Sequence, residues 1–327
     1  YIGFVLGNLG CAMANSFELL LISRIVAGAF GGILGAVIFA IVGDVIPAER
    51  RGVATGKVMS AFAISSVLGI PFGLELALYK GWNFPFWVLS IVSALILILS
   101  FITIPSVTVH FMNADKKMST WELMKDIPKN KNQLYSILCV GLLMLSGFVF
   151  IPFIAPYLVR NNGYAPSNLK WIYFFGGIAS FFTSFFIGKL IDRYGATKVF
   201  KVTMLCSIFP MLILTNLPAC ATYMTLIVTT LFFIGNSSRI SPAVTQLNNH
   251  VEPMYRGNFL SINSYVQSLF TGMAVIIGGV VIREDAQTHE IEHFNVAGLI
   301  AVFFCVLVYL IARNIGREFK SDHGRTS

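Results

Sequence analysis

Charged residues are scarce in this chain of 327 residues, at 12% of the sequence, whereas hydrophobic residues make up 56%. Because soluble domains are roughly one quarter charged, this composition excludes an ordinary soluble domain. The hydrophobic residues gather in long continuous runs, without the alternation that is typical of barrel strands. The sequence therefore predicts an all-α protein that crosses a membrane many times.

Other absences narrow the function. The five cysteines form no CxxC pair, so we expect no disulfide framework and interpret them as small packing residues. Neither a Walker loop nor a glycine-rich dinucleotide motif is present, which disfavours an ATP-driven pump and any cofactor. Transport would then be driven by an ion gradient, most simply of protons, or would be facilitated diffusion. Apolar sequence begins at Tyr1 with no signal peptide, which we interpret as the start of a truncated chain.

Ten apolar segments are expected as helices. The first holds 14 residues, about 21 Å of helix, and is too short to span a bilayer. We interpret it as the end of a longer helix. The ten segments cover residues 1–14, 19–43, 53–78, 83–105, 134–158, 169–191, 199–217, 221–246, 258–282 and 294–315.

The basic residues predict the orientation. If residue 1 lies near the cytoplasmic face, 17 of the 23 Lys and Arg residues fall in inner segments and four in outer segments. Arg24 and Arg239 remain inside the membrane. By the positive-inside rule, both termini of the complete protein are then cytoplasmic, in a plasma (inner) membrane. The net charge of +8 is explained by basic cytoplasmic loops, so we expect no nucleic-acid partner.

The longest hydrophilic stretch, residues 106–133, divides the chain. We predict four spans in 1–105, a cytoplasmic linker with an interfacial helix in 106–133, a six-helix bundle in 134–316, and a cytoplasmic tail in 317–327. An offset of 205 residues carries Gly52 onto Gly257, and Gly73 onto Gly278. This repeat predicts two related six-helix halves, the first without its opening two helices.

Three short stretches resemble signatures of the major facilitator superfamily. "GKLIDRYGATK" at 188–198 matches its loop signature, "RIVAGAFGG" at 24–32 is similar to its fourth-helix signature, and "SSVLGIPFG" at 65–73 is similar to the fifth-helix signature of its antiporters. Ile70 departs from that last pattern by separating Gly69 from Pro71. The resemblance covers the whole chain as family helices three to twelve. It is nearest to bacterial drug-proton antiporters and arabinose-efflux-type permeases.

The resemblance implies several groups of functional residues. Arg24 and Glu75 are candidates for coupling or gating within the membrane, and Gly28, Gly69, Pro71 and Gly73 for close helix packing and a hinge. We expect the cytoplasmic gate to consist of Gly188, Asp192, Arg193, Gly195, Lys198, Arg51, Gly52, Arg256 and Gly257.

The eighth apolar segment points to a binding site. Its stretch "GNSSRISPAV" holds Arg239 and Asn236, and Pro242 interrupts the helix nearby. A polar, broken stretch at mid-membrane is typical of substrate sites in transporters. Further candidates for the substrate cavity are Phe153, Tyr157, Asn263 and Gln267. The alternative for each is an ordinary packing or lipid-facing role.

Residues 289–293, "HEIEH", match the zinc-peptidase pattern H-E-x-x-H as a string. They lie in a short acidic loop on the predicted outer side, too small to hold a catalytic zinc, so we disfavour a peptidase and predict no metal site. The leading hypothesis is a monomeric secondary transporter in the lipid bilayer that exports a small molecule, drug-like or sugar-like, in exchange for protons in the complete protein. An uptake facilitator or symporter of the same fold is the alternative.

Overall fold

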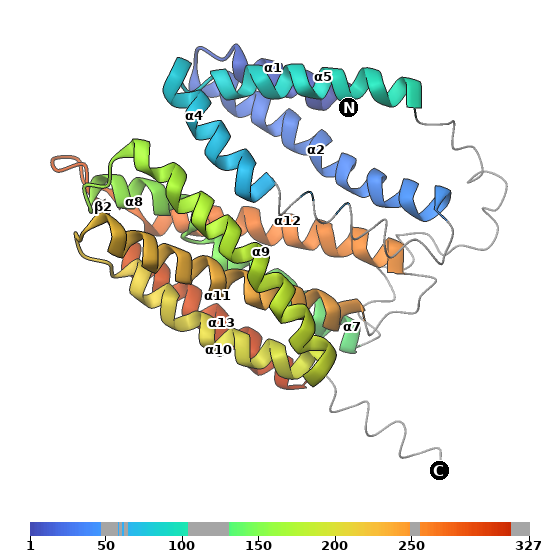
Figure 1. The fold of residues 1–327 in the computed structure, drawn as a ribbon, viewed down its shortest axis with the longest axis vertical. Coiled ribbons are helices and arrows are strands. Elements are labelled where there is room, and N and C mark those ends of the chain that lie inside the picture. The colour runs from blue at the N-terminus through green and yellow to red at the C-terminus, as the bar shows by residue number, and fades with distance from the viewer. Residues whose placement is uncertain (47–57, 59–60, 62–64, 104–130, 249–255, 315–327) are drawn as a thin grey trace. The chain divides into compact units, whose positions relative to one another are not determined.

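The computed structural model describes residues 1–46, 58, 61, 65–103, 131–248 and 256–314 (Figure 1). Most of the predicted linker 106–133 and the tail 317–327 lie outside these residues. The chain divides into two compact units, Tyr1–Lys117 and Met118–Ser327, here called unit 1 and unit 2. Apart from one small hairpin, the described residues form helices and their connections, which confirms the all-α prediction.

Unit 1 is built around α1. Helix α1 packs on both α2 and α5, and α4 packs on α5. Its elements are α1 (Ile2–Ala12), α2 (Phe17–Val45), the π-helix η1 (Ser65–Gly69), α4 (Ile70–Lys80) and α5 (Phe84–Thr103).

A row of glycines lets α1 approach α2 closely. A Cβ atom on Gly3, Gly7 or Gly10 would press into Phe30, the Ala27 backbone or Ser23, respectively, well inside van der Waals contact. Spacing of three to four residues places these glycines on one face of α1. Small residues of this kind are the usual means by which helices associate in lipid, where burial of apolar surface gives little driving force.

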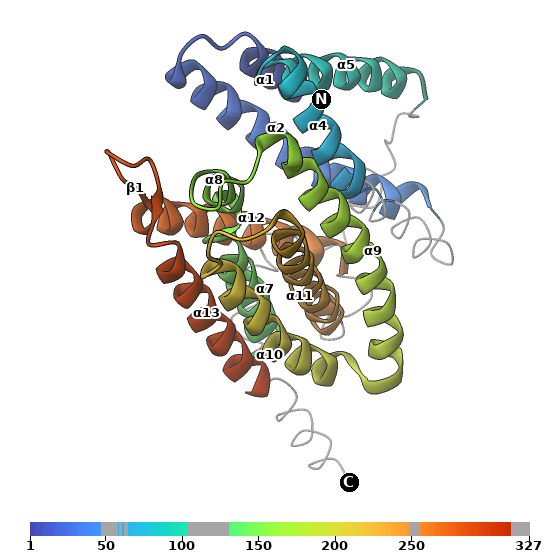
Figure 2. The same cartoon turned by 60° about the vertical axis from the view of Figure 1, so that its left-hand side comes forward.

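Unit 2 has six long helices in its described residues, seen from two sides in Figures 1 and 2. Helix α7 packs on α11, α12 and α13, while α10 packs on α9, α11 and α13. The elements are α7 (Lys131–Phe148), η5 (Ile151–Phe153), α8 (Ile154–Arg160), η6 (Pro166–Asn168), α9 (Leu169–Tyr194), α10 (Ala196–Thr215), α11 (Thr222–Asn248), α12 (Arg256–Val281), β1 (Arg283–Glu284), β2 (Ile291–Glu292) and α13 (Phe294–Asn314).

The span containing α7 is the centre of unit 2. Of its most apolar stretch, 67% is buried inside the protein, against 44% or less for the other candidate spans. This span is also broken: α7 ends at Phe148, a 3₁₀ turn follows at Ile151–Phe153, and α8 continues to Arg160. Pro152 accounts for the break, because it has no N–H to continue the helical hydrogen bonds.

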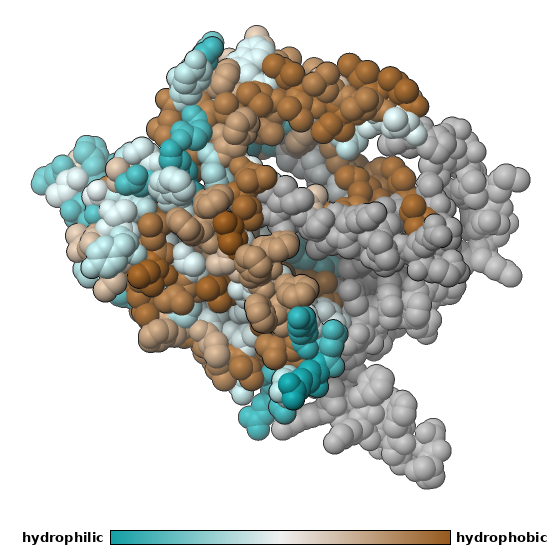
Figure 3. Space-filling model, in the orientation of Figure 1, coloured by the Kyte–Doolittle hydropathy of each residue, from teal (hydrophilic) through white to brown (hydrophobic). Residues whose placement is uncertain are grey.

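Seven helices among the described residues are long and apolar enough to cross a membrane. The other three of the ten predicted segments differ for identifiable reasons. Helix α1 is short, residues 53–78 are only partly described, and α11 is long but carries the polar stretch around Arg239. The lipid-facing chemistry is plain on α5, where apolar side chains such as Phe101 (77% exposed) and Ile102 cover the surface (Figure 3).

Gly278 provides a test of the packing between α12 and the break that follows α7. A Cβ atom there would collide with the carbonyl oxygen of Val149 and lie 2.9 Å from the Phe153 ring, whereas one on the adjacent Gly279 would meet nothing within 4 Å. We expect Gly278→Ala to cost about 1–3 kcal/mol through overpacking, measured as a lower thermal midpoint of the purified protein in detergent. Gly279→Ala is the matched control and should leave the midpoint unchanged; equal midpoints for both variants would contradict this packing.

Candidate functional site

Arg239 is the most deeply buried charge among the described residues. It lies on α11, where it is 1% exposed and so completely enclosed within unit 2. A charged side chain in the membrane interior is costly unless it has polar partners. The groups that surround its guanidinium therefore define the candidate site.

Four helices contribute to this site. One terminal nitrogen of Arg239, Nη1, donates to Ser146 Oγ of α7 at 3.1 Å and to Cys305 Sγ of α13 at 3.1 Å. The same nitrogen lies 3.9 Å from Met211 Sδ of α10. The other, Nη2, donates to Asn236 Oδ1 of α11 at 2.6 Å. Arg239 thus joins α7, α10, α11 and α13 through one side chain.

No carboxylate neutralises this arginine within the described part of unit 2. Asp192 is the sole acidic residue in helices α7 to α13, and it is not among the partners of Arg239. The Nε atom of Arg239 is buried without a hydrogen-bond partner. The guanidinium is therefore held by neutral dipoles, and its positive charge remains uncompensated inside the bundle.

The break in the α7 span lies next to this cluster. A Cβ atom on Gly147 would lie 3.2 Å from Arg239 Nη2 and 3.3 Å from Asn236 Oδ1. Helix α7 ends one residue beyond Gly147, at Phe148, and the 3₁₀ turn begins at Ile151. Discontinuous helices with free backbone groups are typical of transporter binding sites, so the broken span and the Arg239–Asn236 pair form one candidate site.

The other predicted cavity residues lie in different surroundings. Phe153 is half-buried against Gly278, and Gln267 is half-buried on α12. Tyr157 has a structural role: its hydroxyl donates to Leu217 O at 2.9 Å, and its ring stacks on Phe294.

Asn263 of α12 is 3% exposed, and its amide oxygen has no partner. The structure shows direct contact for one predicted pair, Arg239 with Asn236. Two further polar partners of Arg239, Ser146 and Cys305, are not predicted by the sequence.

In unit 1, Arg24 and Glu75 are exposed rather than enclosed. The Arg24 guanidinium lies over the Phe86 ring, 5.7 Å from its centroid. This cation–π contact gives Arg24 a partner within unit 1.

The predicted glycine contacts are only partly found in unit 1. A Cβ atom on Gly28 or Gly73 would meet nothing within 4 Å among the described residues, so neither is a close helix contact within its unit. The close contacts in unit 1 are those between the glycines of α1 and helix α2, because these glycines lie on the face of α1 that packs on α2. Gly69 ends the π-helix η1, and Pro71 stands in the first turn of α4, so this stretch is locally irregular.

The loop signature forms a turn of one residue between α9 and α10. Gly195 has φ +83° and ψ 146°, a conformation that is essentially restricted to glycine. Asp192, Arg193 and Lys198 are exposed around it. Arg256 and Gly257 begin α12, and Arg51 and Gly52 lie outside the described residues.

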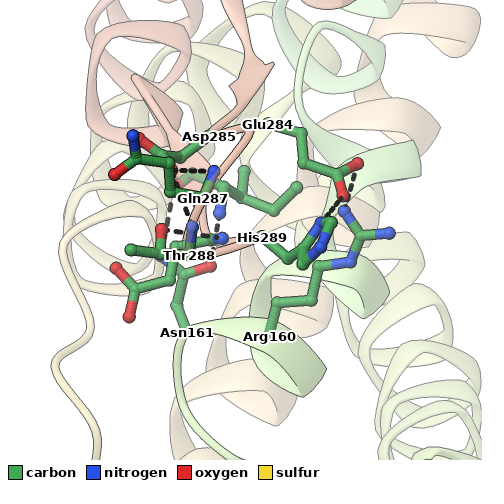
Figure 4. Close-up of polar contacts among 9 residues, drawn as sticks. Arg160, Asn161, Glu284, Asp285, Gln287, Thr288 and His289 are labelled. Carbon is green, nitrogen blue, oxygen red and sulfur yellow. Dashed lines mark hydrogen bonds and ion pairs between the residues drawn. The ribbon is translucent and has the colours of Figure 1, made fainter.

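The HEIEH stretch belongs to a hairpin between α12 and α13, and the described residues contain no cluster of three or more metal-ligating side chains. His289 and His293 both have positive φ, near 60°, so they do not share a helix face. Figure 4 shows that Glu284 pairs with Arg160 of α8 and, at 3.0 Å, with His289. The zinc-peptidase geometry, which needs a helix, is absent here.

The same hairpin is fastened to the end of α8. Asn161 Nδ2 donates to Ile291 O at 3.0 Å, and Ile291 N donates to Asn161 Oδ1 at 2.9 Å (Figure 4). Asn162 donates to Pro218 O at 2.9 Å in the α10–α11 connection. We call Arg160, Asn161, Asn162 and Tyr157 the α8 clamp, because together they tie α8 to both neighbouring connections.

Comparisons with known proteins agree on one family. The Major Facilitator Superfamily model matches residues 1–143 and 136–325. The MFS-type transporter YbcL of Bacillus subtilis is 22% identical over 310 residues, covering 94% of this chain and 76% of YbcL. A probable sugar efflux transporter of Helicobacter pylori is 26% identical over 212 residues, 64% of this chain and 52% of the relative. The chain spans about half the length of several other curated relatives.

A solved structure confirms the fold. A bacterial homologue of the human lysosomal transporter Spinster, inward-facing and unoccupied, superposes with a TM-score of 0.66 at 17% identity. The match covers 95% of this chain and 81% of that structure. The predicted polytopic two-bundle fold is therefore correct.

The Gly195 turn makes a second prediction. Alanine at 195 must adopt a backbone conformation that L-residues avoid, so Gly195→Ala should cost about 1–3 kcal/mol. Gly188→Ala is the matched control, because Gly188 is helical and its Cβ atom would meet nothing within 4 Å. Thermal midpoints of the two purified variants measure the difference. A Gly195→Ala protein as stable as Gly188→Ala would show that the turn tolerates a side chain.

The hairpin should loosen in acid. The hydrogen bond from Arg160, assisted by His289, lowers the pKa of the Glu284 carboxyl from its ordinary value of 4.5. Because the folded pKa is depressed, the stabilisation is complete above the ordinary pKa and is lost as the pH falls through the lowered value. Hydrogen exchange of residues 283–292, corrected for intrinsic rates, should accelerate in that range.

Glu284→Gln should weaken this pH dependence, since the amide does not ionise. A remainder is expected from Asp285, because the hydrogen bonds that it accepts from the Thr288 and Gln287 backbone lower its pKa as well. Glu290→Gln, an exposed change in the same turn, is the control and should keep the full dependence. An acceleration in Glu284→Gln equal to that of the parent protein would assign the effect to another group.

Proposed function

This chain belongs to the major facilitator superfamily, and from that membership we propose a secondary transporter that exports a small molecule by alternating access, in antiport with protons. The protein is a multi-pass membrane transporter and not an enzyme. Export, proton coupling and location in the plasma membrane are the proposed parts. The absence of a nucleotide-binding motif supports an ion gradient as the energy source.

One observation carries the proposal: the polar pair Arg239–Asn236 lies beside the break in the most buried span. A charge enclosed in a membrane span is expensive to maintain and is typical of a substrate or ion pathway. In alternating access a transporter exposes its bound solute to one side of the membrane at a time, and helices α7 and α11 would supply the contacts to that solute from within unit 2. The likeness to probable sugar efflux transporters supports export of a polar solute.

The direct test is flux through the full-length protein in proteoliposomes. With L-arabinose or lactose as the labelled solute, we expect movement that is accelerated by a proton gradient directed opposite to the solute. The accelerated flux should collapse when a protonophore removes the gradient. Flux that does not change with the proton gradient would instead identify a facilitator. Acceleration by a proton gradient in the same direction as the solute would identify a symporter.

Asp192→Asn is the variant in which we expect transport to be impaired. Asp192 belongs to the loop signature and is exposed beside the Gly195 turn, so its loss should slow conformational exchange without affecting insertion. We expect flux to fall about tenfold, or 1.4 kcal/mol, with unchanged protein yield. Glu290→Gln, on the hairpin, is the control for charge. Normal flux in Asp192→Asn would exclude a gating role for Asp192.

A further inference from the structure

The orientation of the Asn236 side chain is determined by Arg239. A guanidinium donates hydrogen bonds and accepts none, so the Asn236 atom at 2.6 Å from Arg239 Nη2 must be the amide oxygen. The amide nitrogen of Asn236 therefore points away from Arg239. It donates to no described residue, and it is not one of the fully buried unpaired atoms, so it reaches the surface of unit 2.

A hydrogen-bond donor at this position needs a polar partner. Asn236 is half-buried at the middle of α11, beside Gly147 of the broken span. An amide with two unused N–H groups is unfavourable against lipid, and polar groups in spans face a partner or a water-filled cavity. The group that satisfies these donors has to be an acceptor, such as a hydroxyl, carbonyl or carboxylate oxygen.

The positive charge of Arg239 restricts the charge of a ligand that binds to Asn236. Arg239 is positive at every pH relevant to a cell, and no carboxylate in the described helices of unit 2 pairs with it. In a medium of low dielectric constant, this charge repels a second cation strongly. Asn236 lies in direct contact with Arg239. A cationic ligand at Asn236 is therefore repelled by this charge, and an anionic ligand is attracted.

We propose that Asn236 is a substrate contact, held by Arg239 so that its amide N–H₂ is presented, and that the site takes neutral or anionic solutes rich in acceptor oxygens while rejecting organic cations. The inference rests on the proposed function and names the substrate class of that same site. Arg239 is a positioning residue here, since it acts on the ligand through Asn236. Of the two classes suggested by the family, drug-like amphiphiles and sugar-like compounds, this chemistry favours the sugar-like one.

The test compares three probes in proteoliposomes that contain the full-length protein. L-Arabinose is a neutral polyol, gluconate an anionic one, and tetraphenylphosphonium an organic cation. We expect counterflow of arabinose, gluconate or both, and none of the cation. Counterflow of tetraphenylphosphonium alone overturns the inference and leaves the transporter in place. Counterflow of no probe contradicts the proposed function, and the inference falls with it.

Asn236→Asp examines the residue itself. The substitution keeps the size and the acceptor facing Arg239, removes both N–H donors, and neutralises the guanidinium with a carboxylate. We expect polyol counterflow to fall about tenfold or more, as for a site whose hydrogen-bond partner is removed, and tetraphenylphosphonium counterflow to appear. The thermal midpoint should be no lower than in the parent protein, because the buried charge gains a partner.

Two controls separate positioning from stability. Asn295→Asp makes the same change in charge at an exposed residue at the start of α13 and should leave all three probes unaffected. Arg239→Gln retains a donor for Asn236 Oδ1 but removes the charge, so polyol counterflow should partly persist while exclusion of the cation is lost. Unchanged selectivity in both Asn236→Asp and Arg239→Gln would overturn the assignment.

Discussion

The guanidinium of Arg239 is the constraint on which unit 2 depends. Its two terminal nitrogens hold Ser146, Cys305 and Asn236, which come from three different helices. The charge cannot be removed by deprotonation, so the bundle has to supply dipoles around it. These dipoles reach the guanidinium only if α7, α11 and α13 keep their positions relative to one another. Stability and the proposed function therefore meet at Asn236, because its amide oxygen faces the charge of Arg239 while its amide nitrogen is presented as a donor on the other side.

A second set of contacts controls the far end of the broken span. The α8 clamp bonds the segment after the 3₁₀ turn to the α10–α11 connection and to the β1–β2 hairpin. The break next to Gly147 is thus bounded by fixed structure on both sides, by the Arg239 cluster and by the clamp.

Much of this architecture could be predicted from the sequence, because continuous apolar runs and basic loops reflect the bilayer directly. The enclosure of Arg239 followed from its depth in an apolar segment. Its partners did not: Ser146 and Cys305 are 93 and 66 residues away, and no periodicity relates them to α11. Glycine spacing was also insufficient. Within unit 1 a Cβ atom on Gly28 would meet nothing within 4 Å among the described residues, whereas one on Gly3, Gly7 or Gly10 would collide with α2, because spacing alone does not reveal which face meets a neighbour.

The central claim is that Asn236 lies on the route of the solute, and accessibility measures this most directly. In a protein whose five cysteines are replaced, with serine at 305 so that Arg239 keeps an acceptor there, a single cysteine introduced by Asn236→Cys can be labelled with a membrane-impermeant maleimide applied to one side at a time. The account predicts labelling from both sides, with a balance that shifts when a proton gradient is imposed. Protection from both sides, with a folded and correctly inserted protein, would place Asn236 in the packed interior and contradict the account.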